Sequence, residues 1–320
     1  MTSKPLLALI SSLMLFAPDH GAFADNAQAP SSCTINGIVS GGGLINGQSV
    51  AFNFSPTSTS SPTWYGGFAS GALDLSCGLF NAQADAAYYD QGTGFVPASD
   101  SSNNVLSTAL SQGHYGGAVF LRDSGFGALG VSASSIMTSA SLTRKLGTFG
   151  GDDGETRFGA FGELYASENL TFGGSVHHFD GAFPYFTNGY SGFELAALAK
   201  YYPSNNLALT GRVDVLLSQL EFDNGAEPIN GMALSLGAEY LVADSGLSVF
   251  ANGIYSSRHQ SFPTSTDTID VSDFVANVGF SFAFGGTPTN SLVARDRSGT
   301  YDNTSTFLEK LPDFVSSSPN

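Results

Sequence analysis

The clearest alternation of hydrophobic and polar positions lies in residues 268–286. Every second residue from Phe274 to Phe284 is apolar, and the positions between them, from Asp273 to Ala283, are mostly polar or small. Successive side chains of a β-strand point to opposite faces, so this pattern predicts a long strand. One of its faces is apolar over its whole length and ends in phenylalanines.

Pairs of alternating segments with very short connections precede this strand. The connections contain Gly, Asp, Asn and Ser, the residues that favour tight turns between antiparallel strands. The pattern predicts five hairpins, formed by residues 64–75 with 79–89, 115–122 with 126–137, 157–166 with 170–179, 190–202 with 207–220, and 231–243 with 247–258.

The connections between hairpins are longer and polar. Short turns that alternate with long polar loops are typical of transmembrane barrels, which place the turns in the periplasm and the loops outside the cell. The expected extracellular loops are residues 91–114, 138–156, 180–189, 221–230 and 259–268.

The direction of the first hairpin requires one more strand before it. Residues 64–75 run toward a short turn, so an earlier strand must carry the chain outward. Two short apolar pieces, residues 34–39 and 50–54, are candidates, and one of them is expected to be that strand. We therefore predict an all-β protein, a transmembrane antiparallel up-and-down β-barrel of twelve strands with both ends in the periplasm.

The composition favours a membrane barrel over a soluble β-sandwich. Charged residues make up only 12% of the chain, about half the usual share in soluble proteins. The formal net charge of −16 argues against nucleic acid as a partner and favours cations near the mouth of a pore. No cofactor or metal site is expected, because the chain has no metal-binding spacing of Cys or His.

The N-terminus has the features of a secretory signal peptide, residues 1–24. Lys4 precedes an apolar core, and Ala22-Phe23-Ala24 is a small-residue cleavage site. The remaining chain divides into an N-terminal segment with the first strand (residues 25–62), the rest of the barrel (63–286) and a polar periplasmic tail (287–320). The tail is expected to be disordered; plugging of the barrel and contact with peptidoglycan are the alternatives.

Cys33 and Cys77 are the two cysteines, and a secreted chain reaches an oxidising compartment, so a disulfide is expected. The strand directions place both residues at the periplasmic end. A disulfide here closes a loop of about 44 residues, which contributes on the order of 4 kcal/mol in the chain-entropy model.

Charged residues on the predicted strands fall opposite the apolar faces. If the apolar faces meet lipid, the charges line the interior, either as an open polar lumen or as ion pairs that fill a narrow one. The predicted lumen-lining charges are Asp74, Asp85, Arg122, Arg157, Glu163, Glu194, Lys200, Arg212, Asp214, Glu239, Arg258 and Asp273.

The last strand also resembles the assembly signal of bacterial outer-membrane β-barrel proteins of the porin-like class. The residues that carry the resemblance are Asn277, Gly279, Phe282 and Phe284. The chain departs from the usual pattern, since it continues to Asn320 instead of ending at the terminal Phe. The resemblance implies a place in the bacterial outer membrane, contact with its lipids and lipopolysaccharide, and recognition by the barrel-assembly machinery.

These features predict a non-enzymatic channel for passive diffusion of small hydrophilic solutes or ions. A closed structural or surface-interaction barrel is the alternative, and twelve strands also resemble an autotransporter translocator domain. A more distant alternative is a rim protease that resembles the omptins, with His177, His178 and Asp180 facing Asp152 and Asp153.

Overall fold

The structure is a computed structural model that describes residues 33–53, 58–60, 63–93, 105–144, 147–182, 189–222, 225–242, 245–261 and 268–301. The predicted signal peptide, residues 1–24, lies outside these ranges. Within them, no helix is both long and apolar enough to cross a membrane.

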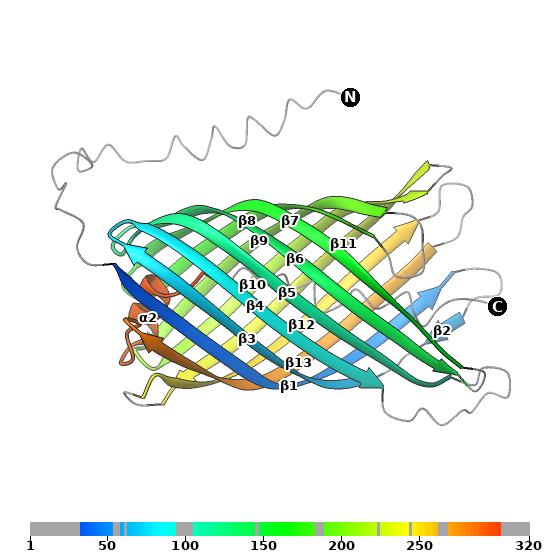
Figure 1. Ribbon diagram of the computed structural model, residues 1–320, viewed down its shortest axis with the longest axis horizontal. Coiled ribbons are helices and arrows are strands. Elements are labelled where there is room, and N and C mark those ends of the chain that lie inside the picture. The colour runs from blue at the N-terminus through cyan, green and yellow to red at the C-terminus, as the bar shows by residue number, and fades with distance from the viewer. Residues whose placement is uncertain are drawn as a thin grey trace.

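The chain forms a closed antiparallel β-barrel of twelve strands, as predicted (Figure 1). Each strand pairs with its neighbours in sequence, and the last strand pairs with the first. The strands are β1 (Thr34–Phe52), β3 (Thr63–Cys77), β4 (Phe80–Thr93), β5 (Val105–Asp123), β6 (Gly127–Arg144), β7 (Gly147–Ser167), β8 (Leu170–Ala182), β9 (Gly189–Ser204), β10 (Leu207–Phe222), β11 (Gly225–Leu241), β12 (Leu247–Ser261) and β13 (Thr268–Gly285). A thirteenth short strand, β2 (Ser58–Ser60), pairs with the end of β1.

The alternation seen in the sequence separates an outer face from an inner one. On β13, Phe274, Val278 and Phe280 are more than half exposed, whereas Asp273 and Val275 are buried. The same division runs along the other strands, so the outer surface carries most of the large apolar side chains. Such an apolar outer band is the surface that a transmembrane barrel presents to lipid.

The first strand differs from the prediction. Neither apolar piece forms it alone, since β1 runs without a break from Thr34 through the glycines to Phe52, inside the second piece. Its register with β13 extends from Asn36 opposite Gly285 to Phe52 opposite Ile269. The sequence did not indicate the whole strand, because glycines show no alternation of apolar and polar side chains. Their backbone groups nevertheless pair with β13 like those of other residues.

The expected long loops are also partly wrong. Residues 138–156 belong mostly to β6 and β7, which pair from Gly127 opposite Leu164 to Arg144 opposite Gly147. β5 likewise begins at Val105, inside the expected loop 91–114. β10 ends at Phe222 and β11 begins at Gly225, both inside the expected loop 221–230. These strand ends are rich in Gly, Ser, Thr and Asp, so they lack the apolar face by which the membrane part of a strand is recognised in a sequence.

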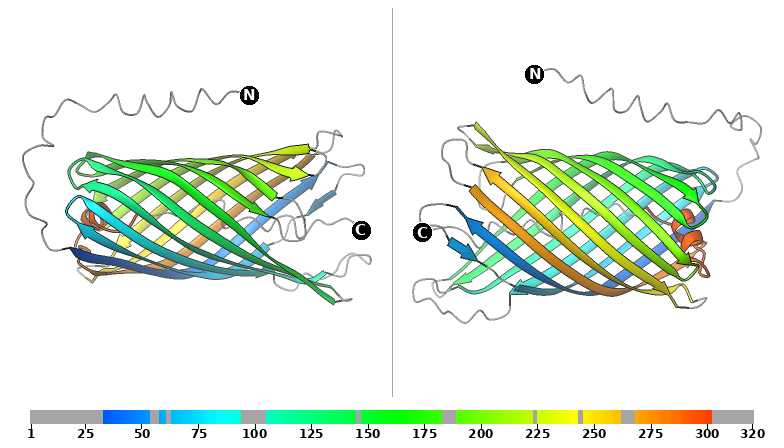
Figure 2. Two further views of the ribbon diagram at one scale, coloured as in Figure 1. Left: turned by 45° about the horizontal axis from the view of Figure 1, so that its top comes forward. Right: turned by 180° about the vertical axis from the view of Figure 1, so that it is seen from behind.

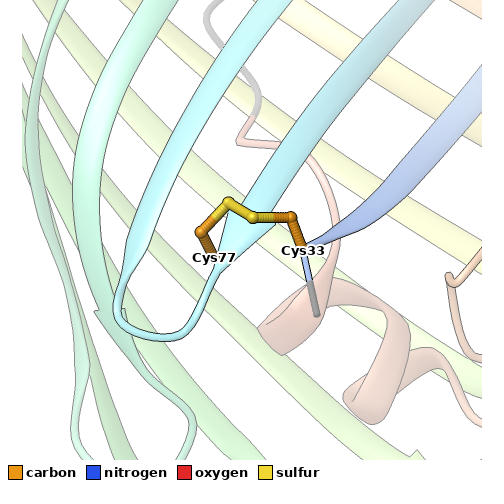
Figure 3. The surroundings of a disulfide bond; sticks show 2 residues. All are labelled: Cys33 and Cys77. Atoms are coloured by element: carbon orange, nitrogen blue, oxygen red, sulfur yellow. A yellow bond between two sulfur atoms is a disulfide. The ribbon is translucent and has the colours of Figure 1, made fainter. Parts of the chain in front are cut away.

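The predicted disulfide between Cys33 and Cys77 is confirmed (Figure 3). Cys33 directly precedes β1 and Cys77 ends β3, whose next residue, Gly78, has a positive φ of 65° in the tight turn to β4. The disulfide therefore ties the first strand to its neighbour at the end of the barrel where the short turns lie.

The tail contradicts the expected disorder in its first part. Residues 287–301 are ordered and contain a short helix, α2 (Leu292–Ser298), whose N-cap Ser291 accepts a hydrogen bond from the backbone of Ala294. In both views of Figure 2, as in Figure 1, α2 lies at the barrel end that carries the short turns. We call residues 287–301 the plug; residues 302–320 lie outside the described chain.

The seam between β1 and β13 contains a close approach that only glycine permits. Gly42 lies opposite Gly279, and a Cβ on Gly42 would come under 3.0 Å from the backbone of Val278 and Gly279. A Cβ on the neighbouring Gly43 would find its nearest atom at 3.8 Å. The two adjacent glycines therefore differ sharply in the space around them.

We expect Gly42→Ala to destabilise the barrel by about 1–3 kcal/mol, since the added methyl group forces the two seam strands apart. Gly43→Ala is the matched control and should leave stability nearly unchanged. Urea unfolding in lipid vesicles, followed by the heat-dependent gel shift of folded barrels, measures both. Equal stability of the two variants would contradict the close approach.

Replacing both cysteines by serine should lower the free energy of unfolding by about 2–4 kcal/mol, because the unfolded chain regains the freedom that the disulfide removes. The same urea titration measures this change. A reductant should shift the unmodified protein by a similar amount and leave the double variant unaffected. A shift of the double variant by the reductant would mean that another cause is at work.

Candidate functional site

The inner face of the barrel carries all twelve charged residues that the sequence placed in the lumen. Seven of them are at most 7% exposed: Asp74, Arg122, Arg157, Glu194, Asp214, Arg258 and Asp273. The other five are partly exposed and border an internal cavity: Asp85, Glu163, Lys200, Arg212 and Glu239.

One group of these charges crosses β7, β9 and β10. Arg157 donates to Glu194 and lies 3.4 Å from Glu155. Arg212 lies 2.7 Å from Asp214 and 3.7 Å from the same Glu194. Buried charges are tolerated only when they are paired, so this side of the lumen is lined by ion pairs rather than by isolated charges.

A second group lies beside the seam. Arg258 lies 3.3 Å from Asp273, which also accepts hydrogen bonds from Gln48 and Ser256 at 3.2 and 3.3 Å. Here β12, β13 and β1 each contribute one or more of the partners. These bonds stabilise the pairing of the last strand with the first.

The plug closes the turn end of the lumen through polar contacts with strands all around the barrel. Asn36 donates to the carbonyl of Ser298 at 3.0 Å, and Arg122 donates to that of Gly299. Gln83 forms two hydrogen bonds with the backbone of Tyr301, at 2.6 and 2.7 Å. These partners belong to neighbouring strands, β1, β4 and β5. On the other side of the lumen, Lys200 of β9 and Glu239 of β11 pair with Asp296 and Arg295, so the plug is fastened across the lumen.

Apolar contacts complete this closure. Leu292, fully buried, packs against Tyr202, Ala208 and Leu241. On the opposite side of the plug segment, the ring of Tyr301 stacks on Phe161 with centroids 3.6 Å apart. The plug thus packs against two separate small apolar clusters of the wall within a polar lumen.

Asp296 is the centre of charge in the plug. It accepts from Lys200 at 2.9 Å and from the Tyr202 hydroxyl at 3.0 Å, and Arg295 lies 3.2 Å away. Arg295 also reaches Glu239 at 2.6 Å. Lys200 and Glu239, both predicted to line the lumen, therefore find their partners in the tail, which the sequence alone did not indicate.

Between the plug and the wall lies the internal cavity, of about 400 Å³, which we call the chamber. Its floor includes Arg295, Asp296 and Tyr301, and its walls come from strands on opposite sides of the barrel. Pockets for small ligands commonly have volumes of about 300–1,000 Å³. The arrangement can therefore hold a small solute above the plug.

The histidines of the omptin-like reading do not lie together. His177 and His178 are successive residues of β8, so they face opposite sides. His177 points inward, with its Nε2 2.9 Å from the Ser132 hydroxyl, whereas His178 lies outside between Phe158 and Phe193. Asp180 shares the outer face.

The side chains of Asp152 and Asp153 are outside the described set, although both residues belong to β7. The structure describes no contact between either histidine and Asp180. Nor do the described His, Cys, Asp and Glu residues form a group suited to a metal ion.

The four residues of the predicted assembly signal all lie on β13, the strand that closes the barrel. Asn277 and Gly279 face inward, whereas Phe282 and Phe284 face outward. Phe284 packs over Gly37 of β1, where an added Cβ would lie under 3.0 Å from the ring in its present position. Their role as a signal stays a prediction.

No protein-family model matches the chain, and no curated protein matches it. Solved structures do resemble it. The COG4313 outer membrane channel from Pseudomonas putida F1 superposes with a TM-score of 0.53 at 8% identity, over 81% of this chain and 99% of that one.

The translocator domain of the autotransporter NalP from Neisseria meningitidis gives a TM-score of 0.45 at 14% identity, over 87% and 96% of the two chains. The Pseudomonas putida toluene transporter TodX gives 0.41 at 11% identity, over 86% and 93%. Of these three superpositions, only that with the COG4313 channel is close enough to show a common fold. The chain has the fold of an outer-membrane β-barrel.

The plug should leave its site as the pH falls from about 4 to 2. Burial alone raises the pKa of Asp296, but Lys200 and Arg295 outweigh it and lower the pKa from 3.8 to about 2. A lowered pKa means that the contact stabilises docking above pH 4 and is lost as the carboxylate is protonated. Pepsin, which acts at these pH values, should therefore cut beside Leu292 at pH 2 and not at pH 4.

Mass spectrometry of the cleaved protein in detergent identifies the cuts. Asp296→Asn should be cut beside Leu292 already at pH 4, because it leaves the partly buried Lys200 without its charged partner. Glu168→Gln, in an exposed turn, is the control and should behave like the unmodified protein. The same cuts in all three proteins at pH 4 would contradict a plug held by Asp296.

Proposed function

We propose that the protein is a non-enzymatic channel of the bacterial outer membrane, through which small hydrophilic solutes or ions diffuse passively. The observation that carries this proposal is the chamber within a polar lumen, bounded below by the plug. A barrel that served only as a structural element would gain from an apolar core, because burying so many charges costs free energy even when they are paired.

The outer apolar band and the shared barrel fold support a place in the outer membrane. There the outer wall contacts lipid and lipopolysaccharide. Residues 1–24 direct export and are cleaved, and the barrel-assembly machinery recognises β13 through Asn277, Gly279, Phe282 and Phe284. All of these partners follow from the proposed location.

The plug favours a channel of small conductance. It fills the turn end of the barrel, so solutes must pass around it or displace it. A closed structural or surface-interaction barrel is the second candidate, and the same observation favours it, because a plug that never moves would leave no passage.

Single-channel recording in a planar bilayer tests the proposal. The full mature chain should give small, stable steps with a modest preference for cations in a salt gradient, as the net charge of −16 favours. A chain that ends at Gly286 lacks the plug and should conduct several times more current. A chain that ends at Tyr301 keeps the plug and is the matched control, with the current of the full chain.

The heat-dependent gel shift shows in each case that the barrel is folded. If the folded full chain and the chain ending at Gly286 are both silent, the protein is not a diffusion channel. If only the shorter chain conducts, the protein is a closed barrel in its resting state and the plug is what closes it.

A further inference from the structure

Three aromatic residues of the chamber wall belong to a row of residues that lie side by side on five neighbouring strands. The register places Phe250 of β12 opposite Gly279, Gly279 opposite Gly42, Gly42 opposite Phe68, and Phe68 opposite Tyr89. All five face inward. We call them the aromatic row.

The two glycines at the centre of this row allow the rings on either side to approach each other. Phe250 and Phe68 are three strand spacings apart, which is about 14 Å along the sheet. Their ring centroids are nevertheless only 5.9 Å apart, and that of Tyr89 lies 6.0 Å from Phe68. The rings therefore lean over the glycines; a Cβ on Gly279 would lie 2.8 Å from the Phe250 ring.

A row of hydroxyl groups runs beside the aromatic row. Two residues further along the same strands, the register aligns Ser248, Ser281, Ser40 and Ser70. Ser248 and Ser281 bond to each other and to Glu239. Ser40 and Ser70 both line the chamber, and among the described residues their hydroxyls have no hydrogen-bond partner. The two rows are about 6–7 Å apart, which is two residues of a strand.

On the opposite wall, too, hydroxyls are free and charges are paired. Ser175, Thr210 and Ser235 also line the chamber, and their hydroxyls contact no described partner. By contrast, Lys200, Arg212 and the plug residues Arg295 and Asp296 are engaged in ion pairs. The hydrogen-bonding capacity left for a solute is therefore mainly neutral.

A ligand for this chamber needs an apolar face for the rings and several hydroxyls for the serines and threonines. A pyranose sugar has both, because its axial C–H bonds form an apolar face and its hydroxyls lie around the rim. A purely aromatic solute would leave the free hydroxyls without partners once water is displaced, which is unfavourable. An ion would find little charge to bind, because Lys200, Arg212, Arg295 and Asp296 are in ion pairs. Arg297 is held by the carbonyls of Ser167 and Leu170.

We propose that the chamber binds a neutral saccharide of one or two rings, with one sugar ring on the aromatic row and its hydroxyls toward Ser40 and Ser70. The inference rests on the proposed function, since it names the class of solute that enters the lumen. The volume of about 400 Å³ accommodates a ligand of this size.

Equilibrium binding to the full mature chain in detergent tests the proposal without requiring conductance. Isothermal titration with maltose should show saturable binding, whereas glycerol, which lacks a ring, and benzyl alcohol, which lacks the hydroxyl array, should not compete. Phe68→Leu and Phe250→Leu should each weaken maltose binding about three- to tenfold, the range seen for single aromatic contacts. Ser40→Ala combined with Ser70→Ala should weaken it by a similar factor.

Phe158→Leu is the matched control, because this residue is 63% exposed on the outer wall. It should bind maltose like the unmodified protein. The proposal is overturned if folded protein fails to bind maltose at tens of millimolar, if the Phe68 and Phe250 variants bind as well as the control, or if benzyl alcohol competes fully.

Conductance separates this inference from the proposed function. Binding of maltose to a protein that never conducts would end the channel proposal and leave the saccharide site standing. Conductance without maltose binding would end the saccharide proposal and leave the channel proposal standing. If the protein both conducts and binds maltose, maltose should reduce the single-channel current of the unmodified protein. The same maltose concentration should reduce the current of Phe68→Leu less.

Discussion

The ladder between β1 and β13 is the interaction on which the rest of the structure depends. In a lipid environment a strand edge has no water to satisfy its backbone N–H and C=O groups, so an open sheet is not stable there. The register from Asn36 opposite Gly285 to Phe52 opposite Ile269 removes both edges at once. Closure also brings Gly42 against Gly279, which leaves the gap in the inner wall over which Phe68 and Phe250 meet.

The closed barrel then has to accommodate the charges on its inner face. Most of them pair within the wall, as Arg157 does with Glu194 and Arg258 with Asp273. Lys200 instead finds its partner, Asp296, in the plug. The tail is therefore part of the electrostatic structure of the lumen rather than an appendage, and its removal leaves a charge of the wall unpaired.

These two features together give the lumen its functional character. The plug closes the turn end, and the chamber above it combines aromatic rings with free hydroxyls while keeping its charges paired. In the channel that we propose, such a lumen would discriminate among solutes by size and by hydrogen bonding more than by charge. The disulfide and the plug both act at the same end, where β1 begins and β13 ends.

The sequence by itself determined the twelve strands, their order, their inner and outer faces, and the disulfide, because these follow from alternation, turn residues and parity along the chain. It missed the unbroken β1 and the strands within residues 138–156, because glycine-rich and polar stretches pair through the backbone without an apolar pattern. The order of the plug and the partners of Lys200 and Glu239 were decided only by the tertiary structure. Asp296 and Lys200 are far apart in the chain, and Phe250 and Phe68 meet only because the sheet closes, so no local pattern contains either contact.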